Sequence, residues 1–161
     1  MPPSLALSPV LVGEDDANDM FLFTRLLKAA GAVNALHIAL DGREAIRLLT
    51  PIVEKNRLVA KPAVAFVDVR MPHLSGLEVL AWIRQQRELD DLAVAMMSAS
   101  PERAEIDRAA TLGAQCFLTK FPRTLAISRL LESAARFNGR DGHSHFDLPD
   151  NLLRQVPRRN G

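Results

Sequence analysis

The stretch Ala63-Val-Ala-Phe-Val-Asp-Val-Arg-Met-Pro-His-Leu-Ser-Gly76 joins an apolar run to a sharp turn and places one carboxylate, Asp68, between them. Residues 63–67 are apolar at every position, which is typical of a central strand of a parallel sheet that is buried on both faces. A strand of this kind needs neighbours on both sides. We therefore expect this segment to lie at the centre of the fold, with Asp68 at its end.

Four further segments have the length and the apolar content of short strands, and helical patterns separate them. We predict strands at 5–12, 36–40, 63–67, 92–97 and 115–119, and helices from Ala17 to about Gly31, from Asp41 to Leu49, from Gly76 to about Gln85, from Pro101 to Leu112 and from Thr124 to Phe137. Parallel strands need helical crossovers, so this alternation predicts a doubly wound α/β sheet. We expect one domain over residues 5–137 and a tail over residues 138–161, either flexible or docked on a neighbour.

Local signals suggest two of the helix boundaries. Ser100 and Pro101 are expected as the N-cap and the first residue of the fourth helix. Pro51 is not expected inside the second helix, because proline cannot donate the hydrogen bond that a helix interior requires. We expect Thr50 to cap a separate short turn that begins at Pro51.

The composition is that of an ordinary soluble surface. A net charge of +1 and a charged fraction of 24% lack the basic excess of nucleic-acid-binding domains and the acidic excess of disordered chains. The single cysteine cannot form an internal disulfide, the N-terminus does not resemble a signal peptide, and no apolar run approaches the roughly 20 residues that cross a bilayer. We therefore expect a cytoplasmic protein without a nucleic-acid or membrane partner.

Polar residues that end separate strands should converge, because the carboxyl ends of parallel strands share one edge of the sheet. These residues are Glu14, Asp15 and Asp16 after the first strand, Asp68 after the third, Ser98 after the fourth and Lys120 after the fifth. Carboxylates gathered in one place repel each other unless a cation lies among them, and hard oxygen ligands suit Mg²⁺. A carboxylate such as Asp68 can then serve as a nucleophile toward a phosphoryl group, while a lysine neutralises charge.

Four motifs resemble those of a known family. They are Val12-Gly-Glu-Asp-Asp16, Phe66-Val-Asp-Val-Arg-Met-Pro72 with Gly76, Met97-Ser-Ala-Ser100 and Phe117-Leu-Thr-Lys120. With them the chain resembles, over roughly residues 5–137, the receiver domain of two-component response regulators. The resemblance implies a flavodoxin-like sheet of five parallel strands in the order 2-1-3-4-5, with five helices.

The resemblance also implies a phosphoryl acceptor and a metal site. A sensor histidine kinase or a phosphotransfer protein would donate its phosphoryl group to Asp68, and Lys120 and Ser98 would assist. The ligands of Mg²⁺ or Mn²⁺ would be Glu14, Asp15, Asp68 and the backbone carbonyl of Arg70, with Asp16 in reserve. The chain would be a self-phosphorylating switch with slow autodephosphorylation rather than an enzyme.

The switch implied by the resemblance involves Ser98, which would move toward the phosphate, and Phe117, which would turn inward behind it. The fourth helix, the fifth strand and the fifth helix would form the output face. Since no effector domain follows in the sequence, the chain resembles a stand-alone regulator that acts through protein contacts, and a homodimer is left open. The long connection at 54–62 resembles that of single-domain regulators paired with phytochrome-type kinases.

Two departures from the family pattern lie beside the site. The family commonly has a proline directly after the lysine, often through a cis bond, whereas Phe121 here separates Lys120 from Pro122. We therefore expect the cis geometry to be absent or displaced by one residue. Arg70 and Ser100 flank the position where a hydrolytic water would approach the acceptor.

Three other functions compete with this interpretation. A Mg²⁺-dependent phosphohydrolase with an aspartate nucleophile would need a second acid two residues after Asp68, where the chain has Arg70. A flavodoxin-like nucleotide binder would need a Gly-, Ser- and Thr-rich loop after the first strand, where the chain has acids. A receiver-like adaptor that accepts no phosphate stays open. In the tail, His143 and His145 are a weaker metal-site candidate.

Overall fold

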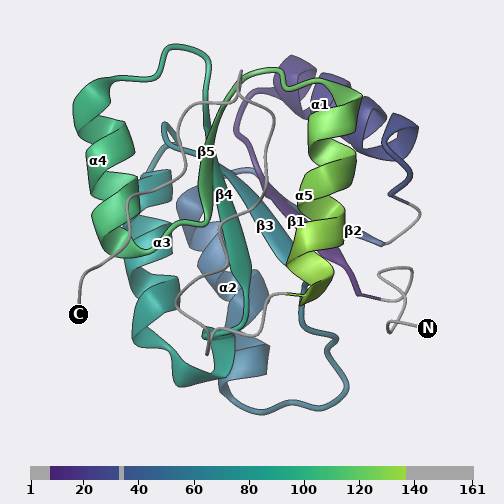
Figure 1. Ribbon diagram of the computed structural model, residues 1–161. Helices are drawn as coiled ribbons and strands as arrows, with labels where there is room; N and C mark the ends of the chain where they lie inside the picture. Colours follow the sequence, from purple (N-terminus) through teal and green to yellow (C-terminus); the bar gives the residue numbers. More distant parts are fainter. Residues whose placement is uncertain (1–7, 33–34, 137–161) are drawn as a thin grey trace.

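The structure is a computed structural model that describes residues 8–32 and 35–136. Its five-stranded parallel sheet consists of β1 (Val10–Gly13), β2 (Leu36–Ala39), β3 (Val64–Asp68), β4 (Ala93–Ser98) and β5 (Cys116–Thr119). The strand order is β2-β1-β3-β4-β5, which confirms the predicted doubly wound, flavodoxin-like fold (Figure 1). β1 begins later than its predicted start at residue 5. The tail over residues 138–161, with its histidine pair, lies outside the described residues.

Within the described residues, five α-helices alternate with the strands and cover both faces of the sheet. They are α1 (Ala17–Ala29), α2 (Gly42–Val53), α3 (Gly76–Gln85), α4 (Arg103–Leu112) and α5 (Thr124–Arg136), and a 3₁₀ turn, η2 (Arg87–Leu89), follows α3. α1 and α5 pack on one face, and α2, α3 and α4 pack on the other (Figure 1). No described helix is long and apolar enough to cross a membrane.

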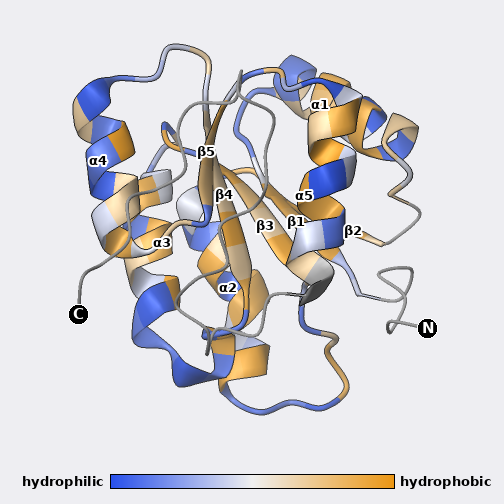
Figure 2. Ribbon diagram, viewed as in Figure 1, coloured by the Kyte–Doolittle hydropathy of each residue, from blue (hydrophilic) through white to orange (hydrophobic). Residues whose placement is uncertain are grey.

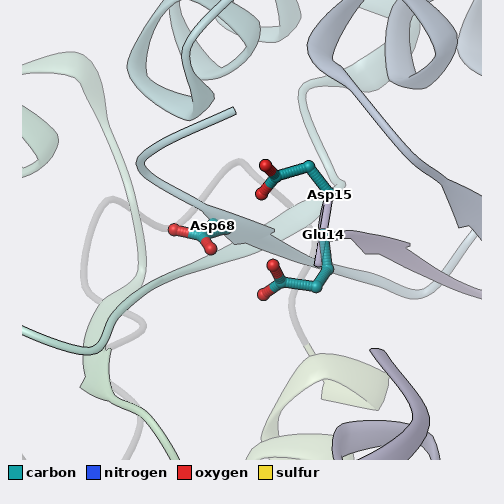
Figure 3. A group of neighbouring side chains, drawn as sticks. All are labelled: Glu14, Asp15 and Asp68. Atoms are coloured by element: carbon teal, nitrogen blue, oxygen red, sulfur yellow. The ribbon is translucent and has the colours of Figure 1, made fainter. Parts of the chain in front are cut away.

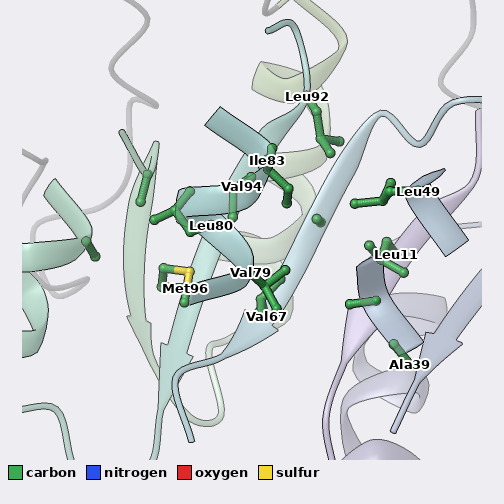
Figure 4. Packing of buried hydrophobic residues seen from close by; sticks show 14 of the residues in the cluster. Leu11, Ala39, Leu49, Val67, Val79, Leu80, Ile83, Leu92, Val94 and Met96 are labelled. Carbon is green, nitrogen blue, oxygen red and sulfur yellow. The ribbon is translucent and has the colours of Figure 1, made fainter. Parts of the chain in front are cut away.

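The central strand β3 contributes side chains to the cores on both faces of the sheet. Val64 and Phe66 lie in the hydrophobic cluster beneath α1 and α5, whereas Ala65 and Val67 lie in the cluster beneath α2, α3 and α4. Successive side chains of a strand point to opposite faces, so a continuous apolar run fills both clusters. Figure 4 shows the second cluster, and Figure 2 shows that apolar residues concentrate along the strands.

The end of β3 lies against the start of α3 through a close approach of two backbone segments. A Cβ atom at Gly76 would lie 2.0 Å from the carbonyl oxygen of Asp68. The Gly76 N–H donates a hydrogen bond to the Val69 carbonyl oxygen at 2.8 Å. The Ser75 hydroxyl caps α3 by accepting from the Glu78 N–H at 3.2 Å. The absence of a side chain at Gly76 therefore allows α3 to begin directly behind Asp68.

α4 begins at Arg103, so the predicted start at Pro101 was wrong. Ser100 is not the N-cap residue; its N–H donates to the Ser98 hydroxyl oxygen at 3.2 Å, and the N-cap is Glu102. The Ser-Pro signal is local, whereas the contact with the end of β4 holds Ser100 in the loop.

α2 continues through Pro51 to Val53, so the predicted separate turn was also wrong. Proline lacks one N–H donor, and because Pro51 lies in the last turn the helix loses a single hydrogen bond near its end. Thr50 does not cap a new turn, since its hydroxyl donates to the Ile46 carbonyl oxygen at 2.8 Å.

Candidate functional site

The predicted strand-end residues come together at one edge of the sheet. Glu14 and Asp15 follow β1, Asp68 is the last residue of β3, Ser98 is the last residue of β4, and Lys120 follows β5. All five strands are parallel, so their carboxyl ends bring these residues to the same edge although they are distant in sequence.

Glu14, Asp15 and Asp68 form an acidic group. One carboxylate oxygen of each residue lies within 4.8 Å of the other two. Figure 3 shows the three carboxylates converging from the ends of β1 and β3. Glu14 and Asp68 are buried, whereas Asp15 is exposed. Asp16, the reserve ligand, is not part of the group, because its carboxylate caps α1 by accepting from the Asp19 N–H at 2.9 Å.

Lys120 provides the positive charge beside this acidic group. Its Nζ lies 2.5 Å from Glu14 Oε2, 2.5 Å from Asp68 Oδ2 and 3.0 Å from Asp19 Oδ2. Only 6% of the lysine side chain is exposed. An ammonium group has three donors, so these three carboxylates satisfy it and fix its position beside Asp68.

Asp19 was not among the predicted site residues. It lies in the first turn of α1 and bonds to Lys120 across 101 positions of sequence. The available signal was an acid in the first turn of a helix that begins at the carboxyl end of a strand. That pattern is also typical of acids that only stabilise the helix N-terminus, so it does not by itself identify a site residue.

Burial and charge shift the pKa of two of these groups. Burial raises the pKa of Glu14 to about 7; hydrogen bonds from Lys120 and from the Asp16 N–H oppose the shift, and the charge of Asp68 adds to it. Burial would lower the pKa of Lys120, but hydrogen bonds to Asp68, Glu14 and Asp19 outweigh it and raise the pKa. Lys120 is therefore held in its charged form, whereas Glu14 is only partly ionised at neutral pH.

The acidic group fits a small divalent cation. Its side chains offer only oxygen ligands, and the exposed Asp15 leaves one side open to the water molecules that Mg²⁺ keeps in its coordination shell. Glu14, Asp15 and Asp68 outnumber the single ammonium group of Lys120, so an added cation would relieve their repulsion.

The two predicted switch residues are both buried. Ser98 is 2% exposed, and its hydroxyl accepts from the Ser100 N–H. Its carbonyl oxygen accepts from the Lys120 N–H at 2.9 Å, which joins the ends of β4 and β5. Phe117 is fully buried in the cluster beneath α2, α3 and α4, so its ring already occupies an inward position.

The peptide bond between Lys120 and Phe121 is cis. The expectation that the cis geometry would be absent or displaced was wrong, because the bond directly after the lysine has it although the next residue is not proline. Phe121 is 40% exposed, and Pro122 is buried. The insertion of Phe121 therefore changes the residue at this position while the cis geometry stays there.

Comparisons with known proteins agree with this geometry. A sequence profile described as the response regulator receiver domain matches residues 10–132. The chain is 24% identical, over 130 residues, to the polar-differentiation response regulator DivK of Brucella ovis; the match covers 81% of this chain and 95% of DivK.

Solved structures of response regulators are also similar to this chain. The bacteriophytochrome response regulator AtBRR is 28% identical, with 82% of this chain and 94% of AtBRR covered and a TM-score of 0.69. The Mn²⁺-bound form of response regulator Rcp1 is 25% identical, with 81% of this chain and 93% of Rcp1 covered and a TM-score of 0.63. Together with the profile match over most of its length, these likenesses show that the chain belongs to the response regulator receiver domain family of two-component signalling.

Proposed function

We propose that Asp68 accepts a phosphoryl group from a sensor histidine kinase or a phosphotransfer protein, and that the chain is a phosphorylation-controlled switch. The observation that carries this proposal is the position of Lys120, whose buried ammonium group bonds to Asp68 and Glu14 at once. A lysine held in this way beside an acidic group neutralises charge where a phosphoryl group would be transferred.

The transfer needs one Asp68 carboxylate oxygen to bond to phosphorus while the bond to the donor's leaving atom breaks. Lys120 is placed to pair with a phosphoryl oxygen, and the Ser98 hydroxyl would donate a hydrogen bond to another. Mg²⁺ or Mn²⁺, held by Glu14, Asp15, Asp68 and the backbone carbonyl of Arg70, would supply further positive charge.

The switch would begin when Ser98 exchanges its hydrogen bond from Ser100 for one to the phosphoryl group. The output face would be α4, β5 and α5, with Phe117 packed beneath it. Phosphorylation need favour the second state by only a few kcal/mol to reverse the population of two states. Slow autodephosphorylation would return the chain to its resting state.

We further infer a cytoplasmic chain with a kinase of the phytochrome type as its partner. The long connection between α2 and β3 supports the kinase type, as does the likeness to AtBRR, which is named as a bacteriophytochrome response regulator. Output through a homodimer is part of the proposal. Light scattering with and without a phosphoryl mimic tests it, since an unchanged mass would count against self-association.

The test of phosphorylation is incubation with a small-molecule phosphodonor and Mg²⁺, followed by intact mass measurement. Wild type is expected to gain one phosphoryl adduct, and Asp68→Asn none. Asp16→Asn is the matched control, because Asp16 is an acid at the same edge that caps α1 and is not part of the acidic group. If wild type gains no adduct from the phosphodonor or from its kinase, the chain is an adaptor that works without phosphate.

A further inference from the structure

Arg70 connects the acceptor to the start of α4. Its backbone N–H donates to Asp68 Oδ1 at 3.0 Å. Its guanidinium reaches α4, where one terminal nitrogen lies 3.0 Å from Glu102 Oε1 and 3.3 Å from Glu105 Oε1. Nε also donates to Glu105 Oε1 at 3.3 Å. A single residue therefore touches the proposed acceptor with its backbone and the output helix with its side chain.

The first turn of α4 has few apolar contacts to hold it. Among the residues of α4, all of which the structure describes, only Ala109 is buried. Glu102 is the N-cap residue, and its N–H donates to Glu105 Oε2 at 3.3 Å, so the two acids bound by Arg70 also cap the helix. Elements with little buried apolar surface open at low free energy. Ile106 packs against the core but is only partly buried, so the contacts of Arg70 add to what holds this end of α4 to the acceptor loop.

These contacts are of a kind that a phosphoryl group can compete with. The side chains of Arg70 and Glu102 are 57% and 67% exposed, and an ion pair that faces water in this way is weak; Glu105 is 17% exposed. A phosphoryl group would add about 1.5 to 2 negative charges at Asp68, and guanidinium groups bind phosphate oxygens through paired, charge-assisted hydrogen bonds.

The acceptor also lies within reach of this side chain. The hydrogen bond between the Arg70 N–H and Asp68 Oδ1 places the Arg70 Cα within about 4.5 Å of that oxygen, since the N–Cα bond adds about 1.5 Å. Rotation about the side-chain bonds of Arg70 would turn the guanidinium from α4 toward a group on Asp68 without movement of the backbone.

We propose that Arg70 is a phosphoryl-contacting residue that exchanges Glu102 and Glu105 for the phosphoryl group on Asp68, and so releases the first turn of α4. This inference rests on the proposed function, because it needs Asp68 to be the acceptor. The predicted role of Arg70 was limited to its backbone carbonyl as a metal ligand. The inference gives its side chain a second role. It also gives α4 a direct link to the acceptor, whereas the hydrogen bond between Ser98 and Ser100 joins the end of β4 only to the loop before α4.

The first test is a mutant cycle on the dissociation constant of trifluoroberyllate, a phosphoryl mimic, measured by calorimetry at saturating Mg²⁺. Glu102→Gln with Glu105→Gln removes the competitors of the mimic and is expected to tighten binding about two- to fivefold. Arg70→Ala is expected to weaken binding about tenfold, and Arg70→Lys less, because lysine keeps the charge without the paired donors. When Arg70 is already alanine, the double substitution Glu102→Gln with Glu105→Gln should change the dissociation constant of the mimic no more than the loss of any other negative charge on α4 does.

The matched control for that general charge effect is Asp107→Asn. Asp107 also lies on α4 but pairs with Arg103, at 3.1 Å, rather than with Arg70. Its effect on binding of the mimic should be the same with and without Arg70. If the glutamine pair behaves like Asp107→Asn, with equal effects in the two backgrounds, Arg70 does not exchange partners and the inference is wrong.

The second test is hydrogen exchange of the amides of residues 106 and 107, the first of which donates to the Glu102 carbonyl oxygen at 3.1 Å. In wild type their exchange should accelerate when the mimic binds, whereas in Arg70→Ala it should be fast already without the mimic. Protection that the mimic leaves unchanged would overturn the release of α4. A wild type that gains no adduct and binds no mimic would overturn the proposed function and this inference together. A normal adduct without coupling in the cycle would overturn the inference alone.

Discussion

Lys120 shows how a single residue determines the electrostatics of the site. Its side chain is buried, and Glu14, Asp19 and Asp68 surround its ammonium group. Buried charges are tolerated when they are paired and hydrogen-bonded, so the lysine and the acids each stabilise the charged form of the other. The acids around Lys120 outnumber its single positive charge. A bound divalent cation would balance the negative charge that remains, and it would have to do so also when a phosphoryl group is present.

We expect Lys120→Met to destabilise the fold and to slow phosphorylation. Glu14 and Asp68 would lose their common donor inside the protein, which should lower the free energy of unfolding by roughly 1–3 kcal/mol without added metal. Loss of a donor to the transferring group should slow phosphorylation roughly 100-fold. Urea denaturation and timed intact mass measure the two effects. Lys61→Met, which removes a lysine from the partly exposed pair with Asp91, should cost at most about 1 kcal/mol and leave the rate unchanged.

The raised pKa of Glu14 predicts a pH dependence of stability when divalent metal is removed. The folded chain keeps a proton on Glu14 up to about pH 7, whereas an unfolded chain loses it near the ordinary glutamate pKa of 4.5. The contribution of Glu14 to stability should therefore fall as pH rises from about 4.5 to 7. The raised pKa of Lys120 acts in the same sense but only at strongly alkaline pH, because its stabilisation is complete below the ordinary lysine pKa.

Urea denaturation of wild type and Glu14→Gln in EDTA, at pH 5 and pH 7.5, checks this prediction. Relative to the variant, wild type should lose roughly 1–3 kcal/mol between the two pH values. Added Mg²⁺ should reduce that difference, because a cation favours the ionised carboxylate. If the free energies of unfolding of wild type and Glu14→Gln in EDTA changed equally with pH, the raised pKa of Glu14 would be contradicted.

At the scale of elements, the junction of β3 and α3 positions Asp68, the proposed acceptor. The helix begins so close behind the strand that only a residue without a side chain fits at Gly76. Met96 of the neighbouring strand lies 3.0 Å from the same Cβ position, so the space is bounded on a second side. Packing of elements, rather than the acidic residues themselves, therefore holds Asp68 at its place in the acidic group.

Gly76→Ala should displace this junction. The added methyl group would meet the Asp68 carbonyl oxygen, a backbone atom that cannot rotate away, and overpacking of this kind costs about 1–3 kcal/mol. Phosphorylation should slow as well, because Asp68 shifts. Gly13→Ala is the matched control, since its Cβ would meet only side-chain atoms at 3.5 Å, and it should change the free energy of unfolding by less than about 1 kcal/mol. Equal stability losses in the two variants would show that the close approach is not what matters.

At the scale of the whole molecule, the site exists only when β1, β3, β4 and β5 are in register. The acidic group joins β1 to β3, the hydrogen bonds of Lys120 join β5 to β1, α1 and β3, and Arg70 joins the loop after β3 to α4. A ligand that occupies this edge would bind the folded chain and have no equivalent site on the unfolded chain.

Binding at the site should therefore stabilise the whole fold. Trifluoroberyllate with saturating Mg²⁺, at about 100 times its dissociation constant, should add about 2.7 kcal/mol to the free energy of unfolding. Thermal unfolding followed by circular dichroism would show this as a higher Tm for wild type and for Asp16→Asn. Asp68→Asn should show no increase from the mimic, and an equal increase in that variant would place the binding elsewhere.

Much of the fold follows from local patterns along the chain. The apolar runs, the helical periods and the strand-end residues are properties of neighbouring residues, so the five strands, their order by resemblance and the convergence of Glu14, Asp15, Asp68, Ser98 and Lys120 could be predicted. Boundaries were less certain, because a contact with β4 moved the start of α4 and because α2 tolerates Pro51 in its last turn.

What only the tertiary structure decided are the partnerships between distant residues. Asp19 and Lys120 are 101 positions apart, and Arg70 and Glu105 are 35 apart. Acidic residues at the start of a helix and charged residues in a loop are common in any sequence. The local sequence does not show which of them form ion pairs with each other. The sequence by itself therefore determined which residues end the strands, whereas helix packing on the sheet decided which charges pair, because an ion pair depends on distance in space.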